Sequence, residues 1–344
     1  MKAHKLHMFS LPFSAHPVLK MSCIILLIIF VLLPPSLIRA ATLTVKDKRG
    51  EAVKIETPVK RAIIHVNYEL IPALGIWDRV VGVGNTAFTN DLVRATKPGT
   101  QNIPIVGEIN AISVEQVVSL KADLLITWTY NIEELRFIEQ KGKIKVVAFY
   151  PENLGEFYEM LRTMGAIFEK EQESSATIER MEEIFSLIRK KAVNISNANK
   201  RSVLWLGSKS TVVIGKNEPI NDIVLMAGGW NPAAVINQNS AEVSVEQIIL
   251  WNPDVIFITG HATYSAKDIL NNPQWKHVRA VREGRVYKAP QWSTWSPRLA
   301  PVALWMAGRI YPERYRDVNQ ERIIDDFFRA VFHIPYARVM KIEN

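Results

Sequence analysis

The chain has 344 residues, of which 48% are hydrophobic, with 42 Lys and Arg against 34 Asp and Glu and a single cysteine. Residues 1–40 hold four of the basic residues and no acidic one, so residues 41–344 carry 38 against 34, without the Lys/Arg-rich runs of nucleic-acid-binding proteins. Because the cysteine is Cys23, residues 41–344 cannot form an internal disulfide and depend on their core for stability. This composition excludes a disulfide scaffold and argues against a nucleic-acid partner.

The first forty residues have the pattern of an export signal. Basic residues up to Lys20 precede an apolar run at 23–33, and a proline pair and small residues lead to Ala40. The apolar run is shorter than the roughly 20 residues that span a bilayer. We therefore expect a periplasmic protein, cleaved after Ala40 and translated from Met1 or Met8. An uncleaved signal would instead anchor it to the membrane.

Strands and helices alternate from residue 61 onward. Apolar runs and helix-end signals predict, in chain order, a strand at 61–66, a helix at 68–74, a strand at 80–83, a helix at 113–120, a strand at 124–127, a helix at 132–141 and a strand at 145–149. This alternation is typical of a mainly parallel sheet with helices on both faces.

A long charged helix is predicted at 169–193. Its apolar residues fall on one stripe, and at 1.5 Å per residue it would reach roughly 30 to 37 Å, about the width of a small domain. We interpret it as a rigid connection between two lobes. The alternative is an ordinary surface helix. The residues of the stripe are Ile178, Met181, Ile184, Phe185 and Ile188.

The alternation resumes after this helix. The predicted elements are a strand at 202–206, helices at 221–227 and 244–251, a strand at 255–259, a helix at 265–270, a strand at 286–289 and a terminal helix pair at 297–308 and 319–332. The sequence thus predicts an α/β protein with an N-terminal lobe at 41–168, a linker helix at 169–194 and a C-terminal lobe at 195–344.

A repeat supports the two-lobe organisation. The sequence Ser-Val-Glu-Gln at 113–116 recurs at 244–247, and in both copies an aspartate and an apolar strand follow. Each copy has a serine where a helix begins and a glutamate, Glu115 or Glu246, in its first turn. A single repeat at this long period excludes a solenoid and indicates similar halves with a cleft between them. Each glutamate either stabilises only the start of its own helix or also binds a basic group of a partner protein.

Sequence motifs give no support for an enzyme. Residues 82–87 match G-x-G-x-x-A, but the residues that follow do not open a helix as a dinucleotide site requires. The sequence contains no G-x-S-x-G, H-E-x-x-H or P-loop motif. His65 and His261 follow predicted strands in opposite lobes, where a metal ion is conceivable. Without an obvious third histidine they are better explained as polar rim residues, and we predict no metal site.

Aromatic side chains concentrate at strand ends and loops. Parallel-sheet proteins bind ligands outside the carboxyl ends of their strands, so we expect these rings to line a large pocket. Arg298 follows two of the tryptophans and is expected to pair with an anionic ligand. The alternative is an exposed loop held in place by its tryptophans. The predicted ligand-binding residues are these aromatic side chains together with His261 and Arg298, namely Tyr68, Trp128, Tyr130, Trp230, His261, Trp292, Trp295 and Arg298.

Several short segments in this order resemble the substrate-binding proteins of ABC importers, in the group that serves cobalamin, ferric siderophores and haem. They extend from Arg61 to Tyr336 and comprise Glu69-Leu70, Val81-Gly82-Val83, Val106-Gly107, Ser113-Val114-Glu115, Ala227-Gly228-Gly229-Trp230-Asn231, Ser244-Val245-Glu246, Asn252-Pro253-Asp254, Gly284-Arg285-Val286-Tyr287 and Pro297-Arg298. The resemblance implies two Rossmann-like lobes joined by one long helix, limited hinge motion and delivery to a dimeric permease. It also implies that Glu115 and Glu246 form salt bridges to arginines on the two permease subunits.

We therefore expect a monomeric, exported binding protein without a cofactor of its own. Its small-molecule ligand is expected to be an iron chelate, haem or a corrinoid. Alternatives within the same fold are a molybdate or tungstate binder or a metal-ion binder, the last disfavoured because the chain lacks the histidine patterns of that branch. An α/β enzyme of the periplasm is the alternative from another class.

Overall fold

The computed structural model describes residues 41–97, 99, 102–129 and 131–343. The predicted export signal and Tyr130 therefore lie outside the described residues. Within those ranges no helix is both long and apolar enough to cross a membrane.

The first sheet has four parallel strands in the order β4-β3-β7-β8, formed by Val80–Val83, Ala62–Ile64, Leu124–Trp128 and Lys145–Phe149. Alternate residues of each strand point to opposite faces. Ile63, Leu125 and Val146 pack with helices α4 (Val114–Ser119) and α5 (Ile132–Gly142). Ile64 and Ile126 join the core that contains α2 (Leu70–Leu74) and α6 (Leu154–Phe168). Both faces are thus buried, as the continuous apolar runs predicted.

The second sheet has five strands in the order β11-β10-β9-β12-β13. Its strands β9, β12 and β13 are parallel, whereas β10 and β11 pair antiparallel at one edge. The strands are Ser240–Glu242, Val212–Ile214, Val203–Leu206, Val255–Ile258 and Val286–Lys288, in that order. One face is covered by α9 (Val245–Trp251) and α10 (Ala266–Leu270), and residues of the other face belong to the core of α8 (Pro219–Met226) and α12 (Leu299–Ile310).

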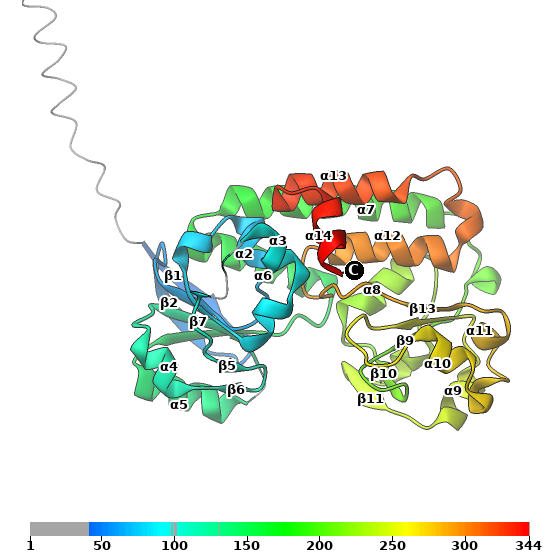
Figure 1. Cartoon of the computed structure of the whole chain (residues 1–344), viewed down its shortest axis with the longest axis horizontal. Coiled ribbons are helices and arrows are strands. Elements are labelled where there is room, and N and C mark those ends of the chain that lie inside the picture. The colour runs from blue at the N-terminus through cyan, green and yellow to red at the C-terminus, as the bar shows by residue number, and fades with distance from the viewer. Residues whose placement is uncertain (1–40, 98, 100–101, 130, 344) are drawn as a thin grey trace, which may run out of the picture. The chain divides into compact units, whose positions relative to one another are not determined.

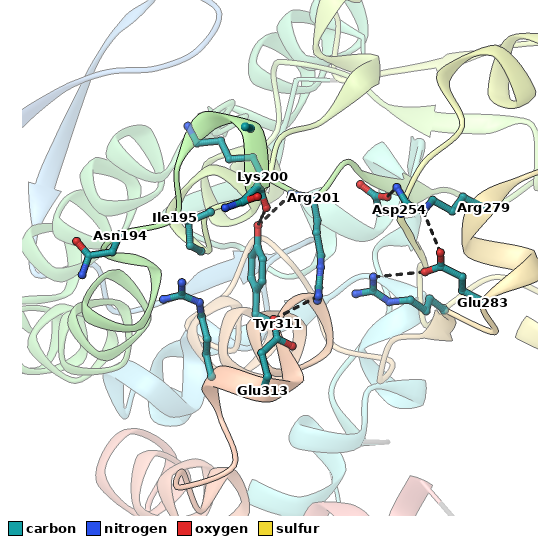
Figure 2. A pocket seen from close by; sticks show the side chains of 13 residues that line it. Asn194, Ile195, Lys200, Arg201, Asp254, Arg279, Glu283, Tyr311 and Glu313 are labelled. Atoms are coloured by element: carbon teal, nitrogen blue, oxygen red, sulfur yellow. Dashed lines mark hydrogen bonds and ion pairs between the residues drawn. The ribbon is translucent and has the colours of Figure 1, made fainter.

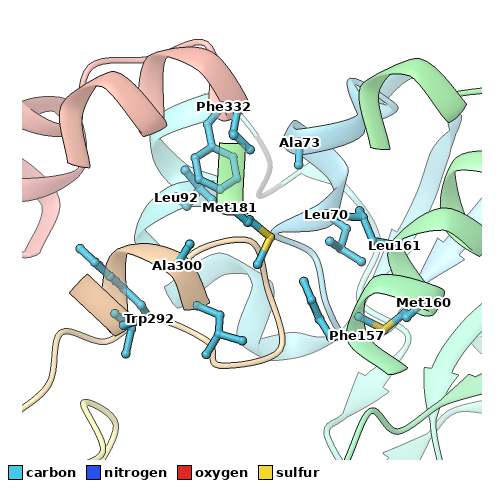
Figure 3. Close-up of a cluster of buried hydrophobic side chains, with 14 of the residues drawn as sticks. Leu70, Ala73, Leu92, Phe157, Met160, Leu161, Met181, Trp292, Ala300 and Phe332 are labelled. Atoms are coloured by element: carbon cyan, nitrogen blue, oxygen red, sulfur yellow. The ribbon is translucent and has the colours of Figure 1, made fainter. Parts of the chain in front are cut away.

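Helix α7 (Glu171–Ala192) lies between the two sheets in the sequence, and it packs on helices that precede it and on helices that follow it. It contacts α2 and α6 from the preceding part of the chain, and α8, α12 and α13 (Gln320–Phe332) from the following part (Figure 1). Met181, Ile184, Phe185 and Ile188 are buried, as the predicted stripe requires. One continuous core therefore joins the two sheets, and Met181, Phe157, Leu70 and Phe332 all belong to it (Figure 3).

The predicted α/β class with two mainly parallel sheets is confirmed. Several elements were not predicted. The antiparallel pairs β1–β2 and β5–β6 and the short helices carry weak signals, because their apolar runs are brief or broken. Helix α6 was also missed, although its buried residues recur at helical spacing; a turn at Glu169, with φ 53°, separates it from α7. The remaining elements are β1 Ala41–Lys46, β2 Ala52–Thr57, α3 Asp91–Thr96, β5 Gly107–Glu108, β6 Ala111–Ile112, α11 Arg279–Arg282 and α14 Tyr336–Glu343.

Candidate ligand-binding site

An aromatic cavity of about 460 Å³ lies at the carboxyl ends of strands from both sheets. Trp128 is the last residue of β7, His261 follows β12, and Trp295 follows β13. Open α/β sheets bind ligands at this edge. The cavity is lined by Val66, Asn67, Tyr68, Glu69, Thr86, Thr89, Asn90, Asp91, Ile109, Trp128, His261, Gln291, Ser293 and Trp295.

The walls are aromatic and held by hydrogen bonds. The indole Nε1 of Trp128 donates to the carbonyl of Ile109 over 2.9 Å, and the hydroxyl of Tyr68 is hydrogen-bonded to Thr86. The rings of Trp128 and Trp295 meet edge to face with their centroids 5.7 Å apart. These contacts fix two large apolar surfaces before a ligand arrives, which reduces the ordering cost of binding.

Tyr150 and Glu218 contact the two tryptophans but do not line the cavity. The ring of Tyr150 lies 4.7 Å from that of Trp295, and the amide of Asn239 donates to its hydroxyl. The indole Nε1 of Trp295 donates to Glu218 over 3.1 Å. Since Tyr150 follows β8 and Glu218 precedes α8, this cluster joins the ends of the two sheets on one side of the cavity.

A buried charge cluster forms the floor. Arg298, at 0% exposure, donates to Glu69 over 2.9 Å and to Asp91 over 2.8 Å, with a second hydrogen bond to Glu69. Burial alone would lower the pKa of Arg298, but the two carboxylates outweigh it and raise the pKa. The expectation that Arg298 pairs with an anionic ligand is therefore wrong for this structure. Its guanidinium is already bound to two carboxylates, which exceed it by one negative charge.

The local sequence positions these carboxylates. Glu69 is the residue before α2, and Asn67 before it adopts a left-handed backbone with φ 59°. Asn90 caps α3 by accepting from the Val93 amide over 3.0 Å, and its own amide donates to Glu69 over 2.7 Å. Two helix starts thus converge on one guanidinium. Neither acid was predicted as a site residue, although an acidic residue at a helix start is a signal that could have identified them.

The structure brings four of the predicted ligand-binding residues together, namely Tyr68, Trp128, His261 and Trp295. Trp292 does not line the cavity. It is 4% exposed and packs on Phe328 and Tyr336 with centroids 5.8 and 5.7 Å apart, because its loop turns inward onto α13 and α14. Trp230 is also elsewhere. It is 44% exposed and bridges to Ser202 before β9, the opposite end of that strand.

The two candidate histidines have different environments. His65 is buried, with one ring nitrogen 2.8 Å from the hydroxyl of Thr127 and the other 2.9 Å from the carbonyl of Glu108. His261 is exposed and lines the cavity. Burial lowers the pKa of the His65 ring, and partial desolvation in the cavity wall lowers the pKa of the His261 ring, which favours neutral imidazole in both. Within the described ranges no group of three or more His, Cys, Asp or Glu could hold a metal ion.

Burial raises the pKa of Glu218 to about 7 from an ordinary value of 4.5, and the nearby Glu152 adds to the shift while the hydrogen bond from Trp295 opposes it. The native protein then retains a proton that the unfolded chain has released. Stability contributed by this group is present below pH 4.5 and is lost as the pH rises through about 7.

We expect Glu218→Gln to leave stability unchanged at about pH 5 and to raise the free energy of unfolding by about 2 kcal/mol at about pH 8, because glutamine cannot ionise. Thermal unfolding of wild type and variant at both pH values measures this. The comparison is made between proteins because the lowered pKa of His65 gives stability the opposite pH dependence. An equal difference at both pH values would show that Glu218 does not titrate in this range.

A second cavity, of about 480 Å³, lies at the amino ends of β9, β12 and β13 and is lined mainly by charged residues (Figure 2). Its arginines are engaged within the protein. Arg279 binds Asp254 over 2.8 Å and Arg285 donates to the last carbonyl of α12, that of Ile310, over 2.9 Å. Arg314 likewise donates to the carbonyl of Lys191 in α7. These side chains complete helix ends, so this cavity is the weaker candidate for a ligand.

The two copies of the repeat form matching helix starts. In α4 the hydroxyl of Ser113 accepts from the backbone amide three residues on over 3.3 Å, and in α9 Ser244 does the same over 3.2 Å. Glu115 and Glu246 occupy the first turns of these helices and are exposed. Neither glutamate lines the aromatic cavity.

Comparison with known proteins confirms the resemblance seen in the sequence. The family model described as periplasmic binding protein matches residues 66–291. The chain is 22% identical over 325 residues to the molybdate-binding protein MolA of Haemophilus influenzae, which covers 85% of this chain and 91% of that protein. It is 24% identical to the Fe(3+)-citrate-binding protein YfmC of Bacillus subtilis, with 73% and 79% covered. The crystal structure of Helicobacter pylori CeuE with Ni(II) bound has a TM-score of 0.78 and 28% identity, covering 87% of this chain and 99% of that one.

Proposed function

The chain belongs to the periplasmic binding protein family, which consists of binding proteins of ABC importers and not of enzymes, and we propose that it captures a metal chelate in the aromatic cavity. The ligand classes are an iron chelate, haem or a corrinoid. We further propose export by residues 1–40 and action as a monomer. In this proposal 41–168 and 195–344 are the lobes, and the helix at 169–194 limits their motion.

The observation that carries this proposal is the position and chemistry of the cavity. Trp128 and Trp295 present apolar rings at the carboxyl ends of two parallel sheets, and His261 adds an exposed ring that is neutral at pH 7. Planar or apolar chelates gain affinity from such rings. A neutral imidazole can accept a hydrogen bond or bind a metal ion that has a vacant coordination site.

The relative MolA, whose name states that it binds molybdate, keeps an oxyanion as the second candidate. A tetrahedral oxyanion needs several hydrogen-bond donors, from backbone amides or from cationic side chains. Arg298, which was expected to pair with an anionic ligand, is bound to Glu69 and Asp91. The chelate is therefore the better candidate for this cavity.

For delivery, we propose that Glu115 and Glu246 bind basic groups of the two permease subunits. Both carboxylates are exposed on matching helices, one near each sheet, outside the aromatic cavity. Exposed apolar side chains accompany them, Val118 on α4 at 46% and Leu250 on α9 at 77%. Charge pairs at an interface chiefly set orientation and association rate.

We expect the charge reversals Glu115→Arg and Glu246→Arg each to slow association with the permease about tenfold or more, and the double reversal to be worse, without changing ligand affinity. Surface plasmon resonance against the cognate permease in nanodiscs measures this. Glu133→Arg is the matched control, since Glu133 is also an exposed acid in the first turn of a helix. Unchanged association of both reversals would reduce the glutamates to helix-start residues.

A further inference from the structure

The floor of the aromatic cavity is acidic. Both charged side chains that line the cavity, Glu69 and Asp91, are acidic, and they are 1% and 6% exposed as residues. No Lys or Arg is among the described residues that line it. Arg298 lies beneath them and offsets one of the two negative charges.

The other charged groups nearby do not reverse this balance. Glu218, behind Trp295, adds negative charge when it ionises. The charge of Lys288 acts on His261, but Lys288 does not line the aromatic cavity; its amine donates to the carbonyl of Ala262 over 2.7 Å, and the side chain lines a separate cavity beside β13. The charged side chains that line the aromatic cavity are therefore acidic, and their carboxylates are partly desolvated, so that they discriminate between opposite and like charges more strongly than in water.

We propose that this floor selects the ligand by charge, so that the cavity takes neutral or cationic metal chelates and excludes free oxyanions and highly anionic chelates. This rests on the proposed function, because it assigns the ligand to the aromatic cavity. Asn90 helps to position these acids. Its side-chain amide donates to the Glu69 carboxylate over 2.7 Å, and the adjacent Asp91 accepts from Arg298. Glu69 and Asp91 are thereby specificity-determining residues.

The test uses two substitution-inert complexes of similar size and opposite charge, the tris(ethylenediamine)cobalt(III) cation and the tris(oxalato)cobaltate(III) anion, together with molybdate. Isothermal titration of the purified protein is expected to give at least about tenfold tighter binding of the cation than of the anion, and no binding of molybdate. Asp91→Asn and Glu69→Gln each remove one negative charge with little change in shape, and each should reduce the preference about tenfold. Circular dichroism establishes that each variant is folded, and one folded variant suffices.

Glu321→Gln is the matched control, because Glu321 is an exposed acid on α13 that does not line the cavity. This variant should prefer the cation over the anion as strongly as the wild type does. Equal or tighter binding of the anion, tight binding of molybdate, or no binding of either complex would overturn charge selection. The variant Trp128→Ala/Trp295→Ala separates this from failure of the proposed function. Cation binding that survives in that variant would place the ligand outside the aromatic cavity. Binding without charge preference that is lost in it would leave the cavity as the site.

Discussion

Replacing Arg298 by alanine is expected to lower the free energy of unfolding by about 3–5 kcal/mol. The guanidinium is fully buried and holds the carboxylates of Glu69 and Asp91 over 2.9 and 2.8 Å. Its removal leaves two buried carboxylates without a cation, although Asn90 still donates to Glu69. Leaving buried charge unpaired costs more than the ion pair itself contributes. Denaturant unfolding followed by circular dichroism measures the change.

Two controls separate charge compensation from packing. Arg322→Ala removes an arginine whose side chain is 79% exposed on α13, and should change stability by less than about 0.5 kcal/mol. Adding Glu69→Gln and Asp91→Asn to Arg298→Ala removes the unpaired carboxylates, so a large part of the stability should return. If the triple variant is no more stable than Arg298→Ala, the destabilisation comes from the lost side-chain volume and not from charge.

The second large effect concerns the aromatic walls. We expect Trp128→Ala/Trp295→Ala to weaken ligand binding by about 3 kcal/mol, more than a hundredfold, because two large rings are removed from one cavity. The measurement is isothermal titration with whichever of ferric citrate, a ferric hydroxamate, haemin or cobalamin binds the wild type. Quenching of tryptophan fluorescence on ligand binding should also largely disappear.

Trp230→Ala is the matched control for this pair, since Trp230 is a 44% exposed tryptophan that does not line the cavity. Its affinity should equal that of the wild type. Should the double variant bind as tightly as the wild type, the ligand site must be sought away from these rings.

Much of the fold could be predicted because its signals are local. The strands β4 and β8 begin and end where the apolar runs do, and the serine caps of α4 and α9 recur with the repeat. Continuous apolar runs identify strands that are buried on both faces. The β1–β2 hairpin lies before the first predicted element and was missed. Polar and apolar residues alternate in its two six-residue strands, so they lack the continuous apolar runs from which the other strands were predicted.

The site was less predictable because its decisive contacts are distant in sequence. Arg298 binds Glu69 and Asp91 across 229 and 207 positions, so nothing near it in the chain shows that its charge is already compensated. Trp292 and Trp295 are three residues apart in one loop, yet one packs in the core and the other lines the cavity. Loop position placed the aromatic residues near the strand ends, and only the folded chain decides which way each ring faces.

The most direct test of the proposed function is the absorption spectrum and metal content of the protein purified from its own cells. Capture of a chelate in the aromatic cavity predicts a coloured protein that carries iron or cobalt in a small-molecule complex, and the Trp128→Ala/Trp295→Ala variant purified in the same way should lack that complex. A colourless protein that carries molybdenum or tungsten, or a protein that carries no small molecule at all, would contradict it.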